Sequence, residues 1–180
     1  MTDDHLLIQQ LQDPDTRRRA FETVVRQYGE QLYWQIRRMV LGHDDANDVL
    51  QNTFLKAWNA ISGFHGDSKL YTWLSRIAIN ESIDFIRRQH NTVDIDADDD
   101  HSIGSTLTAD SYFDGDRAQL LLQKAIAALP DVQRAVFQMK YFDEMKYSEM
   151  SEILGTSEGA LKASYHIAVK KIADYLRDND

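Results

Sequence analysis

The sequence contains no cysteine among its 180 residues, and only two prolines and eight glycines. Without thiols the protein forms no disulfide, holds no thiolate zinc site and has no cysteine nucleophile. The scarcity of proline and glycine favours helices over the many tight turns of a β-sandwich or barrel. Long apolar runs are also missing, and no stretch approaches the roughly 20 apolar residues of a membrane span. We therefore expect an all-α, soluble, intracellular protein without membrane insertion.

Positive charge is also in short supply, because 20 Lys and Arg stand against 29 Asp and Glu, for a net charge of −9. The excess is concentrated in residues 92–116, which hold eight Asp and no Lys or Arg; subtracting that −8 from −9 leaves −1 for the remainder. The average charge therefore does not exclude basic patches elsewhere. The same stretch lacks hydrophobic periodicity, so we expect a flexible acidic linker there.

Apolar residues recur at helical spacing on both sides of this stretch. Before it, we expect four helices: one opened by Asp13-Pro14, a second over 32–42, a third over about 44–61 and a fourth over about 69–90. After it, four more are expected near 117–129, 132–141, 147–154 and 156–176. The sequence thus predicts two small helical domains, residues 1–91 and 117–180, joined by the linker 92–116.

Residues 153–166, ILGTSEGALKASYH, have the pattern of a helix-turn-helix. Gly155 permits the tight turn, and Thr156 or Ser157 caps the following helix. The buried stripe of that helix is expected at Leu161, Tyr165, Ala168 and Ile172. Its exposed face would then carry Glu158, Lys162, His166 and Lys170, with Ala163 and Ile167 beside them. Lys162 could bond a guanine edge or a phosphate and Ala163 could touch a thymine methyl, although an ordinary solvated helix face has the same pattern.

The N-terminal half offers two further polar faces. In the fourth helix, Arg76, Asn80, Asp84 and Arg87 form one row, preceded by Phe64 and close to Trp73. An exposed aromatic ring beside amide and guanidinium groups suits unstacked bases; alternatively, Trp73 belongs to the core and Phe64 only plugs a loop. In the third helix, Asp45, Asp48, Gln51 and Asn52 form an acidic-polar face, which suits a basic protein partner or plain solvation.

With these residues in place, the chain resembles an extracytoplasmic-function (ECF) sigma factor, the compact promoter-recognition subunit of bacterial RNA polymerase. Residues 44–64, DDANDVLQNTFLKAWNAISGF, resemble the second conserved region of that family. Residues 64–89 resemble the segment that melts and reads the minus-ten element, and residues 129–172 the region that reads the minus-thirty-five element. Three motifs in this order, with a variable linker between them, are more specific than any one alone.

The resemblance implies a role for each matching residue. Asp48, Gln51 and Asn52 would dock on the clamp helices of the polymerase β′ subunit. Lys56, Phe64, Arg76 and Asn80 would capture a flipped minus-ten base and its neighbours, while Arg87 and Arg88 would hold phosphates. Lys162, Ala163, His166 and Ile167 would face the minus-thirty-five major groove, with Lys140 and Lys170 on the DNA backbone.

The resemblance also implies partners and a location. The partners are core RNA polymerase, through its β′ clamp and β flap, promoter DNA, and an anti-sigma factor that competes for the same surfaces. The protein would be cytoplasmic in a bacterium, where an anti-sigma factor could hold it at the membrane. Two alternatives stay open: a stand-alone helix-turn-helix regulator that uses only the C-terminal domain, and a helical adaptor that no longer reads DNA.

The chain departs from the family pattern at several positions. Ser164, Ile167 and Val169 stand where Arg or Lys is common, His65 where Arg is frequent, and Asn52 where an acid is usual. Fewer cations predict a weaker electrostatic affinity and a smaller salt dependence. The stretch DIDADDDH, residues 94–101, is not an EF-hand, because Asp99 and Ser105 occupy the positions that need Gly and Glu. No metal, cofactor or catalytic residue is expected, and hence no enzyme.

Overall fold

The computed structural model describes residues 3–93 and 117–179, so the predicted acidic linker lies outside the described residues. The described residues form helices and no strand. The N-terminal part comprises α1 (Asp3–Gln12), α2 (Arg17–Val40), α3 (His43–Ala60), the short 3-10 turn η1 (Ile61–Gly63) and α4 (Leu70–Val93). The C-terminal part comprises α6 (Arg117–Ala127), α7 (Asp131–Phe137), the π-helical segment η3 (Gln138–Phe142), α8 (Tyr147–Leu154) and α9 (Glu158–Asn179). The predicted all-α class with two helical domains is confirmed.

Two features of the N-terminal domain differ from the prediction. α2 is one continuous helix where two were expected, because Tyr28, Leu32 and Ile36 share one buried face and carry the helix through Gly29. A glycine inside a helix costs only about 1 kcal/mol relative to alanine, which this packing offsets. The other feature is α1, which was not predicted, and which places Asp13-Pro14 in the turn before α2 instead of at a helix start.

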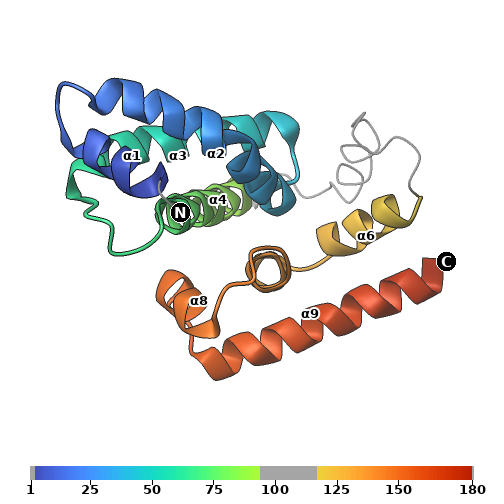
Figure 1. Cartoon of the computed structure of the whole chain (residues 1–180). Coiled ribbons are helices and arrows are strands. Elements are labelled where there is room, and N and C mark those ends of the chain that lie inside the picture. The colour runs from blue at the N-terminus through green and yellow to red at the C-terminus, as the bar shows by residue number, and fades with distance from the viewer. Residues whose placement is uncertain (1–2, 94–116, 180) are drawn as a thin grey trace.

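The C-terminal domain follows the prediction closely. Gly155 ends α8 in the left-handed conformation (φ +63°), where its N–H donates to the carbonyl of Ser151 over 2.9 Å. Ser157 caps α9, since its Oγ accepts the N–H of Ala160 at 3.3 Å. Leu161, Ala168 and Ile172 are buried, as the periodicity predicts. In Figure 1, α9 runs along the domain with α8 at its N-terminal end and α6 beside its C-terminal half.

The two domains pack directly against each other. Ala135, Val136 and Met139, on α7 and η3, belong to the same buried cluster as the N-terminal core residues, together with Met145 and Met150. In Figure 1, the orange coil of residues 131–142, seen end-on, lies between α9 and the N-terminal helices. A smaller second cluster closes the C-terminal domain around Ile126, Phe137, Ala168 and Ile172. The core of the protein is therefore continuous across the domain boundary.

Candidate polymerase and nucleic-acid interface

The face of α3 that was predicted to dock a partner is exposed. Asp48, Gln51 and Asn52 all lie in solvent, while Val49 and Thr53 on the opposite side are buried. The same face continues to Leu55 and Trp58, whose exposed fractions are 56% and 40%. The spacing from Asp48 to Asn52, Leu55 and Trp58 is that of one helix face and could have identified both apolar residues.

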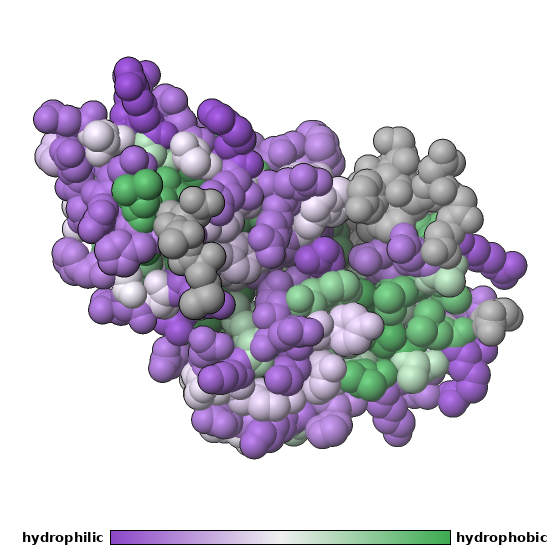
Figure 2. Space-filling view, viewed as in Figure 1, coloured by the Kyte–Doolittle hydropathy of each residue, from purple (hydrophilic) through white to green (hydrophobic). Residues whose placement is uncertain are grey.

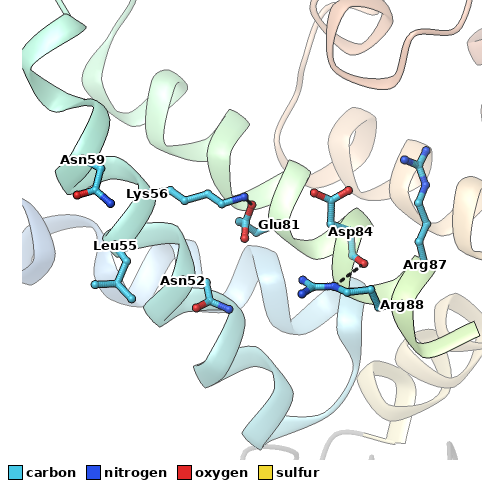
Figure 3. Close-up of a pocket in the computed structure, with 8 residues that line it drawn as sticks. All are labelled: Asn52, Leu55, Lys56, Asn59, Glu81, Asp84, Arg87 and Arg88. Carbon is cyan, nitrogen blue, oxygen red and sulfur yellow. Dashed lines mark hydrogen bonds and ion pairs between the residues drawn. The ribbon is translucent and has the colours of Figure 1, made fainter. Parts of the chain in front are cut away.

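Lys56 lies in an open groove of about 570 Å³ between α3 and α4. Asn52, Leu55 and Asn59 line one wall, and Glu81, Asp84, Arg87 and Arg88 line the other. The Nζ of Lys56 pairs with the carboxylate of Glu81, whose side chain is buried, and the Nε of Arg88 donates to the Asp84 carbonyl at 3.2 Å. Figure 3 shows Arg87 pointing away from Lys56. Three basic residues predicted to contact minus-ten DNA, Lys56, Arg87 and Arg88, thus line the same groove. Asn52, from the face predicted to dock on polymerase, lines it as well.

Phe64 does not present its ring to solvent. It is only 5% exposed, and its ring packs against Trp73 with the centroids 5.0 Å apart. The expectation of an exposed aromatic ring at Phe64 is therefore wrong, because the ring is buried at the base of the loop. The side chains that this loop exposes include His65, Asp67 and Lys69, and Gly66 between the first two has φ +84°. A part for Phe64 in base capture stays a prediction, and it would have to act through the shape of the loop.

The two other minus-ten candidates on α4 differ in access. Asn80 is exposed. Arg76 is partly covered by the C-terminal domain: its side chain is 36% exposed, and its Nη2 lies 3.8 Å from Glu149 and 3.5 Å from Glu152, both on α8. Arg76 therefore makes ion pairs across the domain boundary.

The outward face of α9 carries the predicted minus-thirty-five residues together. Lys162, Ala163, His166 and Lys170 are exposed, and Ile167 is 47% exposed. Lys162 lies with its Nζ 5.5 Å from the ring centre of Tyr147, the first residue of α8. Lys140 approaches the same ring from η3 at 4.9 Å and donates to the carbonyl of Met145 at 3.1 Å. The helix-turn-helix therefore presents small and apolar side chains flanked by lysines. This combination suits a DNA major groove, which offers both hydrogen-bond acceptors and thymine methyl groups.

A polar network spans the domain boundary. Gln35 on α2 donates to Ser75 at 2.6 Å and to Asp143 at 2.8 Å. Arg38 donates to Gln138 at 2.9 Å and lies 4.4 Å from the ring centre of Phe142. Burial raises the pKa of the Asp143 carboxyl above its usual range, although the hydrogen bonds from Gln35 and Gln138 oppose that shift. The boundary thus holds a buried polar network, with Gln35, Ser75 and Gln138 each 1% exposed, beside its apolar cluster.

An apolar groove of about 530 Å³ lies between α6 and the C-terminal part of α9. Leucine side chains form its floor, with Arg117 and Arg177 at its borders. Figure 2 shows this hydrophobic patch on the same face as the domain boundary. Within residues 3–93 and 117–179, no cluster of His, Asp or Glu could hold a metal ion, and none of the helices found there is long and apolar enough to cross a membrane.

Comparison with known proteins agrees with this geometry. The family model described as Sigma-70 region 2 matches residues 24–92, and that described as Sigma-70, region 4 matches residues 119–172. The ECF RNA polymerase sigma factor SigW of Bacillus subtilis is 33% identical over 168 residues, covering 88% of this chain and 90% of its own. The RNA polymerase sigma-H factor of Pseudomonas aeruginosa is 28% identical, covering 89% and 86%.

Two solved structures have the same fold. CnrH, in complex with the cytosolic domain of CnrY, matches with a TM-score of 0.66 at 23% identity, over 98% of this chain and 99% of its own. The sigma factor RpoE of Bartonella quintana, in complex with the anti-sigma factor NepR, matches with a TM-score of 0.68 at 22% identity, over 87% and 96%.

A region-2 domain followed by a region-4 domain defines a class of protein, the sigma factors, which are transcription initiation factors and not in general enzymes. Within that class, this chain belongs to the ECF sigma factors. It is an alternative sigma factor that directs core RNA polymerase to specific promoters and promotes opening of the DNA for initiation. The stand-alone regulator and the adaptor are thereby set aside.

Proposed function

We propose that three surfaces of the described residues divide the work of initiation. The exposed face of α3, with Asp48, Gln51 and Asn52, docks on the polymerase β′ clamp, and Leu55 and Trp58 extend that contact. An acidic-polar face with an apolar end suits a basic partner that also buries apolar area. Residues 1–91 would form the domain that carries this surface and the minus-ten site.

The minus-ten site is proposed to combine Asn80 and the loop at Phe64 with the groove cations Lys56, Arg87 and Arg88. Arginines bind phosphates well, and amide groups read base edges. Arg76 would join them once α8 has left, because its guanidinium now pairs with two carboxylates of that helix. We therefore place separation of the domains before DNA opening.

The minus-thirty-five element is proposed to be read by α9, within a domain of residues 117–180. The observation that carries this part is the outward row of α9 behind an ordered turn, with Gly155 left-handed and Ser157 as the cap. Lys162, Ala163, His166 and Ile167 would enter the major groove, while Lys140 and Lys170 would contact the backbone. With few cations, the affinity would come from polymerase and both domains together.

An anti-sigma factor is proposed as a further partner, since the Bartonella RpoE was solved with the anti-sigma factor NepR, and CnrH was solved with the cytosolic domain of CnrY. Such a partner would cover the α3 face or the minus-ten groove and so exclude polymerase or DNA. We further propose that the protein acts in the cytoplasm, that an anti-sigma factor can hold it at the membrane, and that it has no catalytic activity of its own.

The test is reconstitution with core polymerase on a promoter library. Promoter-dependent initiation is expected, and its absence with any regulator removed would overturn the proposal. On a selected promoter, Asn80→Ala should impair opening while core binding stays intact. If Asn80→Ala instead abolishes core binding, Asn80 does not belong to the minus-ten site.

A further inference from the structure

The N-terminal helix α1 is bonded to the loop that joins α3 to α4. The side-chain amide of Gln12 donates to the carbonyl of Ile61 at 3.0 Å and to the carbonyl of Phe64 at 2.5 Å. The Ile61 carbonyl also accepts the backbone N–H of Phe64 at 3.2 Å, whereas the Phe64 carbonyl lies beyond the end of η1, outside any helix. A glutamine amide has two N–H donors, which matches these two acceptors.

The crest of the same loop also rests on α1. Gly66 has φ +84°, and a side chain there would meet the Cδ1 of Ile8 at 3.8 Å. Phe64 anchors the other side of the loop by packing against Trp73 at the start of α4. The loop is therefore held by α4 on one side and by α1 on the other.

α1 itself is fixed to the domain, so it can hold a loop in place. Leu7 and Leu11 are buried in the core. The guanidinium of Arg17 donates to the carbonyls of Leu11 and Gln12 at 2.8 and 3.1 Å and so caps the C-terminal end of the helix. Tyr28 ties the other end through a 2.9 Å hydrogen bond to Asp4.

Between α1 and the loop lies an open groove of about 910 Å³. One wall comes from α1, with Asp4, His5 and Gln9, and the other from the loop, with His65, Asp67 and Lys69. Imidazole, amide, carboxylate and ammonium groups thus border the exposed side of the loop. Polar groups of this kind bind the edges of an unstacked base only if the walls are held at a defined spacing.

We propose that Gln12 is a positioning residue for minus-ten base capture: from the lining of this groove, its amide bonds two loop carbonyls and so sets the shape of the 62–69 loop. The inference rests on the proposed function of that loop. The two Gln12 hydrogen bonds join residues 49 and 52 positions apart in sequence. Losing them would free the loop from α1 while Phe64 stays buried.

The experiment uses holoenzyme assembled with the full chain and a promoter selected from the library. Binding is measured on a fork template whose minus-ten region is already unpaired, with the natural base or an abasic site at each unpaired position in turn. Gln12→Met removes both hydrogen bonds at similar volume. Gln10→Met is the matched control, because Gln10 is exposed on the same helix and lines neither this groove nor the loop.

Wild type and Gln10→Met should lose about tenfold in affinity at the captured position when its base is removed. Gln12→Met should bind the intact fork about tenfold more weakly and lose nothing further at the abasic site, with unchanged affinity for core polymerase. If Gln12→Met only weakened the fold, the affinity for every template would fall by the same factor, and the penalty at the abasic site would remain. That result would contradict the inference. Should Gln12→Met fail to fold, Gln12→Asn, whose amide is too short to reach both carbonyls, is judged by the same criterion.

A full abasic penalty in Gln12→Met, equal to that of wild type, would overturn the inference while leaving base capture by the loop intact. If wild-type holoenzyme itself shows no abasic penalty at any unpaired position, the proposed base capture fails, and the role of Gln12 fails with it.

Discussion

Replacing Arg134 should uncouple the unfolding of the two domains. Its guanidinium is buried, with 6% of the residue exposed. Its Nε donates to the carbonyl of Met39 at 3.0 Å, and its Nη1 to those of Ala127 and Leu129 at 3.2 Å each. Met39 lies in the last turn of α2 and Ala127 ends α6, so one side chain satisfies carbonyls that each helix leaves unpaired. Arg134 therefore caps two helices, one in each domain.

The magnitude follows from the groups that lose their donor. Arg134→Met fills the space but leaves three carbonyls without it, and a buried unpaired acceptor costs about 1–3 kcal/mol. Asp131, which accepts from Nη2 at 2.7 Å, is partly exposed, so its loss adds little. Allowing for water at the outermost carbonyl, we expect about 3–5 kcal/mol of destabilisation. Arg134→Lys keeps the charge without the planar fork and should cost about half as much.

The assay is urea unfolding of the full chain. The three tryptophans, Trp34, Trp58 and Trp73, all lie in α2, α3 and α4, so their fluorescence reports the N-terminal domain while far-UV circular dichroism reports both. Arg134→Met should make the dichroism transition precede the fluorescence transition. The control is Arg177→Met, because Arg177 is exposed and pairs only at the surface with Asp174 and Asp178; it should change stability by less than about 0.5 kcal/mol. Coincident transitions, with Arg134→Met within about 1 kcal/mol of wild type, would refute the reasoning.

Three further predictions concern DNA contacts and the domain boundary. Lys162→Ala should weaken recognition of the upstream element by about 1–3 kcal/mol if Lys162 contacts a base, measured on matched and mutated promoters; an unchanged preference would remove Lys162 from the site. Glu152→Gln, which breaks one of the two ion pairs of Arg76, should raise binding of the free protein to single-stranded minus-ten DNA a few-fold, since exposed pairs are worth up to about 1 kcal/mol; equal binding would argue that α8 does not restrict Arg76. The third concerns Asp143, whose raised pKa means that its contribution to stability is greatest below about pH 4 and is lost as the pH rises through the raised value. With Gln35, Gln138, Arg38 and Tyr71 around it, Asp143→Asn should increase the unfolding free energy near pH 7 and flatten its pH dependence, and an unchanged slope would contradict this.

The helix-turn-helix was predictable because its signals are local. A glycine that ends one helix, a serine that caps the next, and the buried positions of α9 are all set by neighbouring residues. The same logic misplaced the start of α2, where Asp13-Pro14 imitates a helix opening but lies in a turn. It also divided α2 in the middle, where the burial of Tyr28 and Leu32 against other helices outweighs the local signal from Gly29.

The non-local features escaped prediction for a physical reason. Gln12 and Phe64 meet only because α1 folds back over a loop 52 residues away, and nothing in either segment encodes the distance. The exposure of Trp58 and the burial of Phe64 are likewise set by the fold: both rings pack against one aromatic partner, Phe21 and Trp73 respectively, yet Trp58 stays 40% exposed and Phe64 only 5%. Residue type therefore identified the chemistry of the site, and packing decided which groups reach solvent.

The packed domain boundary sets an energetic condition on promoter binding. Its apolar cluster, with Val136 and Met139, favours the closed arrangement, whereas the buried hydrogen bonds of Gln35, Arg38 and Asp143 would be replaced by hydrogen bonds to water on opening, at small net cost. If closure is favoured by about 2.7 kcal/mol, only about one molecule in 100 is open, and the apparent affinity for DNA at the proposed Arg76 contact would fall by the same factor. A polymerase that binds both domains apart removes this penalty, because it selects the open form before DNA arrives. The scarcity of cations on α9 and the pairing of Arg76 therefore act in one direction: both make promoter binding depend on polymerase.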